Sequence, residues 1–117
     1  MILFIEYPKC TTCIKAKKFL MENGVVFDSR NIKDDKPTRD ELKKWYELSK
    51  IPLRKMFNTS GLLYKELNLK DKLDDMSDEE KLDLLSTNGM LLKRPILITK
   101  KGVTFGFKEE TWQELLK

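Results

Sequence analysis

The sequence predicts an α/β fold with a mixed four-stranded sheet, and three observations lead to this prediction. Short apolar runs of strand length follow Met1, Gly24 and Pro95. Segments with apolar residues at helical spacing separate these runs. The chain has 117 residues, of which 40% are hydrophobic and 36% charged, which is the balance of an ordinary globular protein. We therefore expect a single domain over residues 1–117, with a helical insertion at about 38–90.

The N-terminal part predicts a strand, a helix and a second strand. The first strand lies in the apolar segment Ile2–Tyr7, and the helix covers about Thr12 to Asn23, where Gly24 provides a stop. The second strand begins at Val25–Phe27 and fades toward Ile32. A strand, helix and strand in this order favour a right-handed parallel unit.

The central region is predicted to be helical. After a charged loop over residues 33–37, Thr38 and Glu41 have the spacing of a capping box, and Ser77 and Glu80 repeat that spacing. Each pair precedes leucine or aromatic residues at helical intervals. Two of the helices in the insertion therefore have a predicted starting point.

The C-terminal part predicts a hairpin followed by a helix. Ile96–Thr99 is an apolar strand, residues 100–102 form a tight turn, and Val103–Phe107 returns as the partner strand. Glu109–Lys117 carries Trp112 among apolar residues at helical spacing. The complete order is strand-helix-strand, helical insertion, strand-strand-helix, which is a thioredoxin-like arrangement with extra helices between its halves.

Cys10 and Cys13 form a Cys-x-x-Cys pair where the first strand gives way to the first helix. The free amides and partial positive charge at a helix N-terminus favour a thiolate, which is the nucleophilic form of cysteine. Cys10 is therefore the candidate nucleophile. Cys13 is expected on the same helical face within reach of a disulfide, which suits a resolving cysteine. The alternative, that either thiol is a small buried hydrophobic residue, stays open.

Several other cysteine chemistries are excluded by residues that the sequence lacks. The chain has two cysteines and no histidine, whereas a structural zinc site needs four ligands, so we predict no metal site. The missing histidine also removes a Cys-His catalytic dyad. Ile14 follows the pair where covalent haem attachment requires histidine, and Ala16 stands where a phosphatase-type Cys-x5-Arg loop requires arginine.

The charge and hydropathy of the chain limit its partners and location. The net charge of +4 arises from 23 basic and 19 acidic residues that are interspersed, without a basic tract interleaved with aromatic residues. We therefore expect no direct nucleic-acid binding. No apolar stretch of about 20 residues and no cleavage signal are found, so we expect a cytoplasmic protein without membrane association. The oligomeric state that we expect is a monomer. In a reducing compartment, a lone Cys-x-x-Cys is expected to be a transient redox pair.

Six motifs then follow one another along nearly the whole chain. They are Tyr7-Pro8-Lys9-Cys10-Thr11-Thr12-Cys13, Phe57-Asn58-Thr59-Ser60-Gly61, Tyr64-Lys65-Glu66-Leu67-Asn68-Leu69, Asp83-Leu84-Leu85, Arg94-Pro95-Ile96 and Val103-Thr104-Phe105-Gly106-Phe107-Lys108. In content and order these motifs resemble the arsenate reductase/Spx family, and most closely its small Spx-like members that are related to arsenate reductase. The resemblance implies a thioredoxin-like fold, in agreement with the order of elements.

The resemblance also implies which residues carry the chemistry. Arsenate reductases of this family use a cysteine at the Cys10 position, three arginines that hold the oxyanion, and glutathione with glutaredoxin as reductant. Arg94 matches one arginine, whereas Asn58 stands in place of another, with Arg54 one helical turn away. Lys108 follows the hairpin where the third arginine would lie, and lysine lacks the planar fork that suits arsenate. Because the family's reductase loop usually has serine at the Cys13 position, arsenate reduction is the least favoured of the functions considered.

Spx-type regulators provide a second comparison. They keep the Cys-x-x-Cys pair as a redox switch and bind the alpha subunit of RNA polymerase, which makes that subunit an alternative partner. Pro52 corresponds to the glycine associated with polymerase contact in Spx.

The resemblance further implies a cis Arg94–Pro95 bond, although only about 5 to 6% of X-Pro bonds in folded proteins are cis and the residues alone favour trans. From the residues alone, Arg94 could equally form an ion pair with an acidic neighbour.

The leading prediction is a thiol-disulfide oxidoreductase in which Cys10 attacks, Cys13 resolves and Arg94 stabilises negative charge. The alternatives are a redox-sensitive transcriptional regulator and a structural protein in which both cysteines are dispensable. We expect no bound cofactor, a disulfide-bearing protein or small thiol as partner, and thioredoxin or glutathione with glutaredoxin as reductant. The predicted substrate or anion-binding residues are Thr11, Thr12, Asn58, Pro95 and Lys108.

Overall fold

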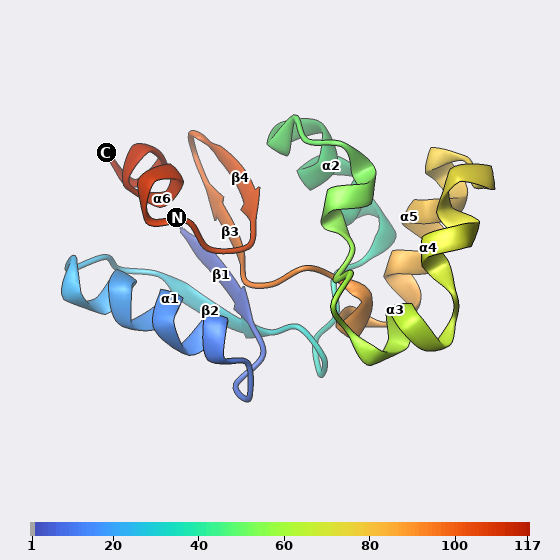
Figure 1. The fold of residues 1–117 in the computed structure, drawn as a ribbon. Coiled ribbons are helices and arrows are strands. Elements are labelled where there is room, and N and C mark those ends of the chain that lie inside the picture. Colours follow the sequence, from blue (N-terminus) through green and yellow to red (C-terminus); the bar gives the residue numbers. More distant parts are fainter. Residues whose placement is uncertain (1) are drawn as a thin grey trace.

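The computed structural model describes residues 2–117, which form a mixed four-stranded sheet with helices on both faces (Figure 1). The strands lie in the order β2-β1-β3-β4. The pairing of β1 with β2 is parallel, whereas β1 with β3 and β3 with β4 are antiparallel. The predicted α/β arrangement is thus confirmed. The strand bounds are β1 Leu3–Glu6, β2 Asp28–Asn31, β3 Ile96–Thr99 and β4 Gly102–Phe105.

Helix α1 connects β1 to β2, the insertion lies between β2 and β3, and α6 follows β4. The helices outside the insertion are α1 Thr11–Glu22 and α6 Glu109–Leu116. The insertion contains α2 Arg39–Ser49, α3 Leu62–Glu66, α4 Leu69–Lys72 and α5 Asp78–Thr87, with the short 3₁₀ helices η1 Leu53–Met56, η2 Leu73–Asp75 and η3 Gly89–Leu91. The predicted helical insertion is therefore present, but it is divided into short elements.

The predicted second strand, from Val25 toward Ile32, includes β2, but its start is too early. Val25–Phe27 precede β2, which begins at Asp28. Val25 and Phe27 pack against the core from this loop, while the side chain of Val26 is 84% exposed. Pairing with the backbone of β1 begins at Asp28, opposite Leu3. The start of β2 is defined by backbone hydrogen bonds to β1, and the apolar side chains of residues 25–27 do not indicate where these bonds begin.

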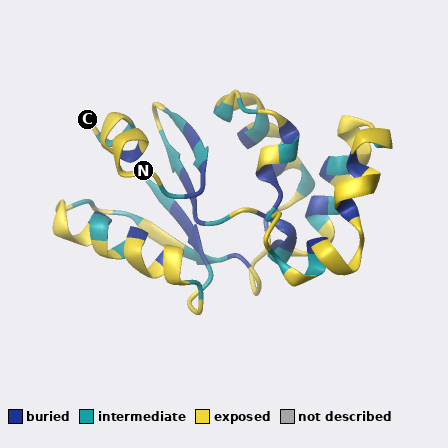
Figure 2. Cartoon of the chain, in the orientation of Figure 1, coloured by how far each residue is buried: buried dark blue, intermediate teal, exposed yellow. Residues whose placement is uncertain are grey.

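The two faces of the sheet carry separate apolar cores, and buried positions face the sheet from both sides (Figure 2). On one face, α1 and α6 cover Phe4 and Leu97, and Trp112 of α6 is fully buried there. On the other face, the insertion packs against the sheet. Its core includes Ile5, Leu42, Trp45, Ile96, Val103 and Phe105. The sheet thereby fixes the position of the insertion relative to the start of α1.

Both predicted capping boxes are confirmed. The Thr38 side chain accepts from the Glu41 amide at the start of α2, and Ser77 accepts from the Glu80 amide at the start of α5. Each glutamate side chain returns a bond to the amide of its capping residue. These bonds satisfy amides that have no partner within the first helical turn.

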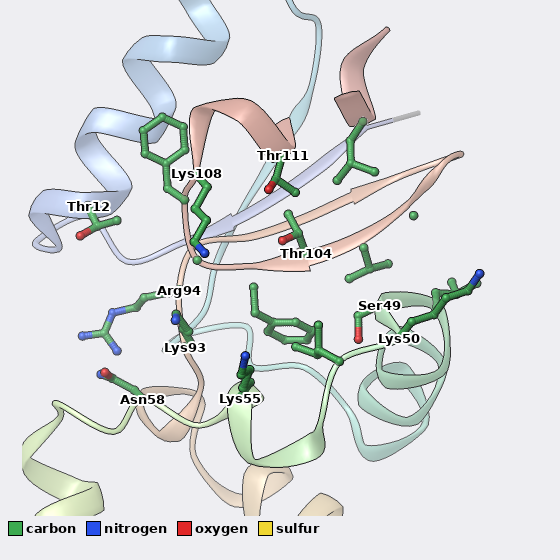
Figure 3. Close-up of a pocket in the computed structure, with 18 of the residues that line it drawn as sticks. Thr12, Ser49, Lys50, Lys55, Asn58, Lys93, Arg94, Thr104, Lys108 and Thr111 are labelled. Carbon is green, nitrogen blue, oxygen red and sulfur yellow. The ribbon is translucent and has the colours of Figure 1, made fainter. Parts of the chain in front are cut away.

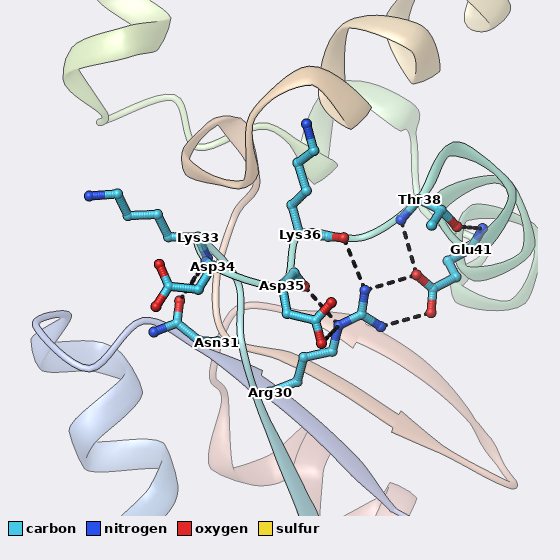
Figure 4. Close-up of polar contacts among 8 residues, drawn as sticks. All are labelled: Arg30, Asn31, Lys33, Asp34, Asp35, Lys36, Thr38 and Glu41. Atoms are coloured by element: carbon cyan, nitrogen blue, oxygen red, sulfur yellow. Dashed lines mark hydrogen bonds and ion pairs between the residues drawn. The ribbon is translucent and has the colours of Figure 1, made fainter.

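An arginine on β2 fastens the insertion to the sheet (Figure 4). The Arg30 guanidinium donates to both carboxylate oxygens of Glu41, at 2.7 and 2.9 Å. It also donates to the backbone carbonyls of Asp35 and Lys36, at 2.8 and 3.0 Å. The Arg30 hydrogen bond is the main cause that lowers the pKa of Glu41 from its ordinary value to about 2. The capping glutamate therefore also connects two parts of the fold.

Within residues 2–117, every helix is too short or too polar to pass through a lipid bilayer.

Candidate functional site

Cys10 occupies the capping position immediately before α1, at the end of the turn that follows β1. The Cys10 amide donates to the Tyr7 carbonyl at 3.0 Å, and its own carbonyl accepts from the Ile14 amide at 3.0 Å. These bonds place the thiol at the helix N-terminus, as the sequence predicts. Cys10 is partly exposed, whereas Cys13, in the first turn of α1, is 1% exposed. Both are free cysteines, and Cys10 is the more accessible of the two.

The two thiols differ in acidity. Burial acts to raise the pKa of Cys10, but the amide and thiol of Cys13 and the guanidinium of Arg94 together outweigh it, and the pKa lies below the ordinary thiol value. Burial raises the pKa of Cys13 to about 12, and the neighbouring Cys10 contributes to this increase. The accessible cysteine therefore favours the thiolate, and the buried cysteine keeps its proton.

Arg94 lies next to Cys10, although the two residues are far apart in the sequence. Among the described residues, its Nε and Nη1 atoms are buried and have no hydrogen-bond partner. Its guanidinium carbon lies 5.4 Å from the centre of the Tyr7 ring, which is within the range of a cation–π contact. The alternative of an ion pair with an acidic neighbour is therefore wrong, because these buried donors are not taken by a carboxylate. They are available to an anion at the Cys10 sulfur.

A groove of about 850 Å³ joins Cys10 and Arg94 to other predicted residues. Thr12, Asn58 and Lys108 also line it, and in Figure 3 the Arg94 side chain extends toward the side on which Thr12 and Asn58 lie. Two other predicted residues are not in its lining. Thr11 is exposed at the start of α1, and Pro95 is buried. The Arg94–Pro95 bond is cis, as the resemblance implies.

Several residues near Cys10 and Arg94 had no role predicted from the sequence. Tyr7 was not assigned a role, although it lies in the same motif as Cys10 and contacts Arg94. Lys93 and Lys55 also line the groove. Lys93 could have been predicted to line the groove, because it is next to Arg94 in the sequence. Lys55 could not, because its position in the groove depends on how η1 packs.

The arrangement provides one guanidinium for an oxyanion. Of the arginines in the described residues, only Arg94 lines the groove. The side chain of Arg54 instead forms an ion pair with Asp74. Asn58 lies in the groove but carries no charge. A site built on three arginines is therefore not formed here.

Within residues 2–117 no cluster of three or more cysteine, aspartate or glutamate side chains has the arrangement of a metal site. The groove lining contains one sulfur ligand, Cys10, surrounded by cationic and neutral residues. Cations in this position oppose the binding of a metal ion and favour an anion.

Comparison with known proteins shows the family of this chain. The sequence matches the ArsC family over residues 5–115. It is 50% identical over 113 residues to the uncharacterized protein YusI of Bacillus subtilis (strain 168), covering 97% of this chain and 96% of YusI. It is 32% identical to the global transcriptional regulator Spx of Streptococcus mutans over 110 residues, which are 94% of this chain and 79% of Spx. A crystal structure of an ArsC family related protein from Bacteroides fragilis superimposes with a TM-score of 0.95 at 53% identity, covering 97% of this chain and 96% of that one. The chain therefore belongs to the ArsC family and has its thioredoxin-like fold.

Proposed function

We propose that this protein is a thiol-disulfide oxidoreductase that uses Cys10 as nucleophile and Cys13 as resolving cysteine. The observation that carries the proposal is the pairing of a partly exposed Cys10, at the start of α1, with the buried and unpartnered donors of Arg94. An anion at the Cys10 sulfur gains from both the helix N-terminus and the guanidinium. This applies to the thiolate itself and to the negative charge that passes between sulfurs during exchange.

In the first step, the Cys10 thiolate attacks one sulfur of a substrate disulfide. A bond forms between that sulfur and Cys10, the substrate S–S bond breaks, and the leaving thiolate takes a proton from water. Formation of the mixed disulfide removes the charge from Cys10. The contribution of Cys10 that raises the pKa of Cys13 is then lost, whereas Arg94 still acts to lower it. Cys13 thus becomes easier to deprotonate once Cys10 has captured a substrate.

In the second step, the Cys13 thiolate attacks the Cys10 sulfur and releases the substrate as a second thiol. The products are two substrate thiols and a Cys10–Cys13 disulfide, so two electrons pass from the protein to the substrate. An external dithiol or thiol returns the pair to its reduced form, and the reductant we propose is thioredoxin or glutathione with glutaredoxin. Arg94 transfers no proton in either step. Its guanidinium stays charged and stabilises negative charge on sulfur.

The proposal is tested by trapping the intermediate. Cys13→Ser protein mixed with a small neutral disulfide is expected to accumulate a mixed disulfide on Cys10, seen as an added mass by intact mass spectrometry. The matched Cys10→Ser variant should give no adduct, because its remaining thiol is buried. If neither variant forms an adduct while the wild-type protein also fails to reduce the disulfide, the proposal is wrong.

A redox-sensitive regulator is the second candidate, supported by the identity to Spx over most of this chain. In this case the Cys10–Cys13 state would control binding of a protein such as the RNA polymerase alpha subunit. Reduced and oxidised protein should then bind the purified alpha subunit with different affinities, measured by calorimetry, while turnover of disulfides is negligible. Equal affinity in both states would exclude this function. The Cys10 reactivity described above is required by both candidates.

A further inference from the structure

The groove at Cys10 extends far beyond the two cysteines. It passes along β4 and reaches Leu115 of α6 at its other end. Six cationic side chains line it and, within residues 2–117, no carboxylate does. They are Lys50, Lys55, Lys93, Arg94, Lys101 and Lys108. In a chain with 23 basic and 19 acidic residues, this separation of charge makes the groove a local region of positive potential.

The floor of the groove is the edge of the sheet. No further strand of the described residues pairs with the outer side of β4. The Gly106 amide donates to the Pro95 carbonyl at 2.8 Å. With the antiparallel register of β3 and β4, this bond shows which residues of β4 are hydrogen-bonded to β3. Because bonded residues alternate along such a pair, the amides and carbonyls of Val103 and Phe105 point away from β3. Both residues line the groove, so unpaired backbone groups face it.

Two walls flank this edge. One wall is the end of α2 and the segment after it, from Leu48 to Ile51, and the other is α6, with Thr111. In Figure 3, Ser49 and Lys50 lie on one side of the β4 ribbon and Thr111 on the other. The apolar side chain of Leu48 is 46% exposed at this wall. Four residues of an added strand would cover about 13 Å, which matches the four residues of β4.

We propose that the groove binds an extended, acidic segment of a disulfide-bearing protein as an added strand on β4, with the substrate disulfide at the Cys10 end. This inference rests on the proposed function and names its substrate class. Backbone pairing at Val103 and Phe105 supplies binding that is independent of side chains, and the lysines select acidic residues. The chemical step is the exchange already described, in which the partner's disulfide is the oxidant.

The lining favours a peptide over a nucleic acid. Binding of single-stranded nucleic acid depends on exposed aromatic faces on which bases stack. The aromatic residues of the groove are otherwise engaged: Phe105 is 8% exposed in the core, and Phe107 packs against Trp112 with ring centres 4.8 Å apart. Unpaired strand groups, by contrast, are the feature that an extended peptide requires.

The inference is tested with peptides that contain no cysteine, so that binding is measured apart from chemistry. An eight-residue peptide that alternates glutamate and valine and a matched peptide with lysine for glutamate are titrated into isotope-labelled, reduced protein. The acidic peptide is expected to bind at least about tenfold more tightly and to shift the amides of Val103 and Phe105. N-methylation of its backbone should abolish these shifts. Equal binding of both peptides, retained binding after N-methylation, or tighter binding of an oligonucleotide of equal charge would each overturn the inference.

Charge reversal locates the binding surface. Lys55→Glu with Lys101→Glu is expected to lower the ratio of acidic to basic peptide affinity by about tenfold or more. The matched control, Lys70→Glu with Lys72→Glu, changes the net charge equally on α4, away from the groove, and should leave that ratio unchanged. An equal change in both variants would mean that overall charge, and not the groove, selects the peptide, and would overturn the inference.

Exchange with a small neutral disulfide separates the two proposals. If the wild-type protein turns over that disulfide but shows no preference for the acidic peptide, the inference is wrong and the proposed function stands. If the peptide binds but neither a small disulfide nor a disulfide attached to that peptide reacts with Cys10, the proposed function is wrong. The segment is then not a substrate, and the inference fails with it.

Discussion

At the scale of single residues, the chemistry of this protein depends on the different surroundings of two cysteines in one helical turn. Cys10 is accessible and close to Arg94, whereas Cys13 is 1% exposed. Opposite pKa shifts follow from these positions: hydrogen bonds from Cys13 and then the Arg94 cation lower the pKa of Cys10, whereas burial raises the pKa of Cys13. The pair therefore contains one sulfur suited to attack, Cys10, and one that stays protonated until the second step, Cys13.

The rate of alkylation of Cys10 tests this difference. Measured against pH with iodoacetamide in the wild-type protein, the rate should have a midpoint below the ordinary thiol pKa of about 8.5. Cys13, with a pKa of about 12, should not contribute in that range. Arg94→Gln should move the midpoint to higher pH, because the cation that favours the thiolate is lost. Arg54→Gln is the matched control and should leave the midpoint unchanged, since that guanidinium pairs with Asp74. A wild-type midpoint at or above 8.5 would contradict the assignment of Cys10.

At the scale of elements, the insertion depends on polar contacts as well as on its apolar face. Arg30 of β2 binds the carboxylate that also caps α2, so one glutamate serves the helix start and the connection to the sheet. The side chain of Arg30 is 15% exposed and that of Glu41 is 34% exposed, which reduces screening by solvent relative to a fully exposed pair. Such bidentate pairs are stronger than isolated surface ion pairs.

The Arg30–Glu41 contact predicts a specific dependence of stability on pH. The pKa of Glu41 is lowered to about 2 in the folded protein, so its stabilising contribution is complete above the ordinary value of 4.5 and is lost as pH falls toward 2. Arg30→Gln should lower the free energy of unfolding by about 1–2 kcal/mol at pH 7. This difference from wild type should narrow between about pH 4.5 and 2, measured by urea unfolding. Lys117→Gln, which removes an exposed ion pair with Glu114, should show neither effect. A difference that is the same at pH 7 and pH 2 would contradict this account.

At the scale of the whole molecule, one sheet connects two cores, and each core contains one of the two tryptophans. Trp45 of α2 lies in the core beneath the insertion, and Trp112 of α6 lies in the core shared with α1. The radius of gyration is 13.8 Å, close to the value of about 13 Å for a compact domain of 100 residues. Because both cores use side chains of β1 and β3, neither is expected to unfold while the other stays folded.

Single-tryptophan variants test this coupling. In Trp45→Phe and in Trp112→Phe, the remaining tryptophan reports on one core by fluorescence, while circular dichroism reports on all helices. The two signals should give the same urea midpoint within each variant, even though the variants differ in stability from each other. Separate midpoints in either variant would show that the insertion and the rest of the sheet unfold independently.

The sequence by itself determined the features that depend on near neighbours along the chain. Both capping boxes, the start of α1 just after Cys10 and the β3–β4 hairpin could be predicted, because each involves residues only a few positions apart. Tertiary structure alone decided that β2 begins at Asp28, that Arg94 reaches Cys10 with its donors unpaired, and that lysines from separate elements line one groove beside β4. The physical reason is that these groups are positioned by backbone pairing and side-chain packing between segments that are far apart in the sequence. The spacing of neighbouring residues does not show which distant segments come together.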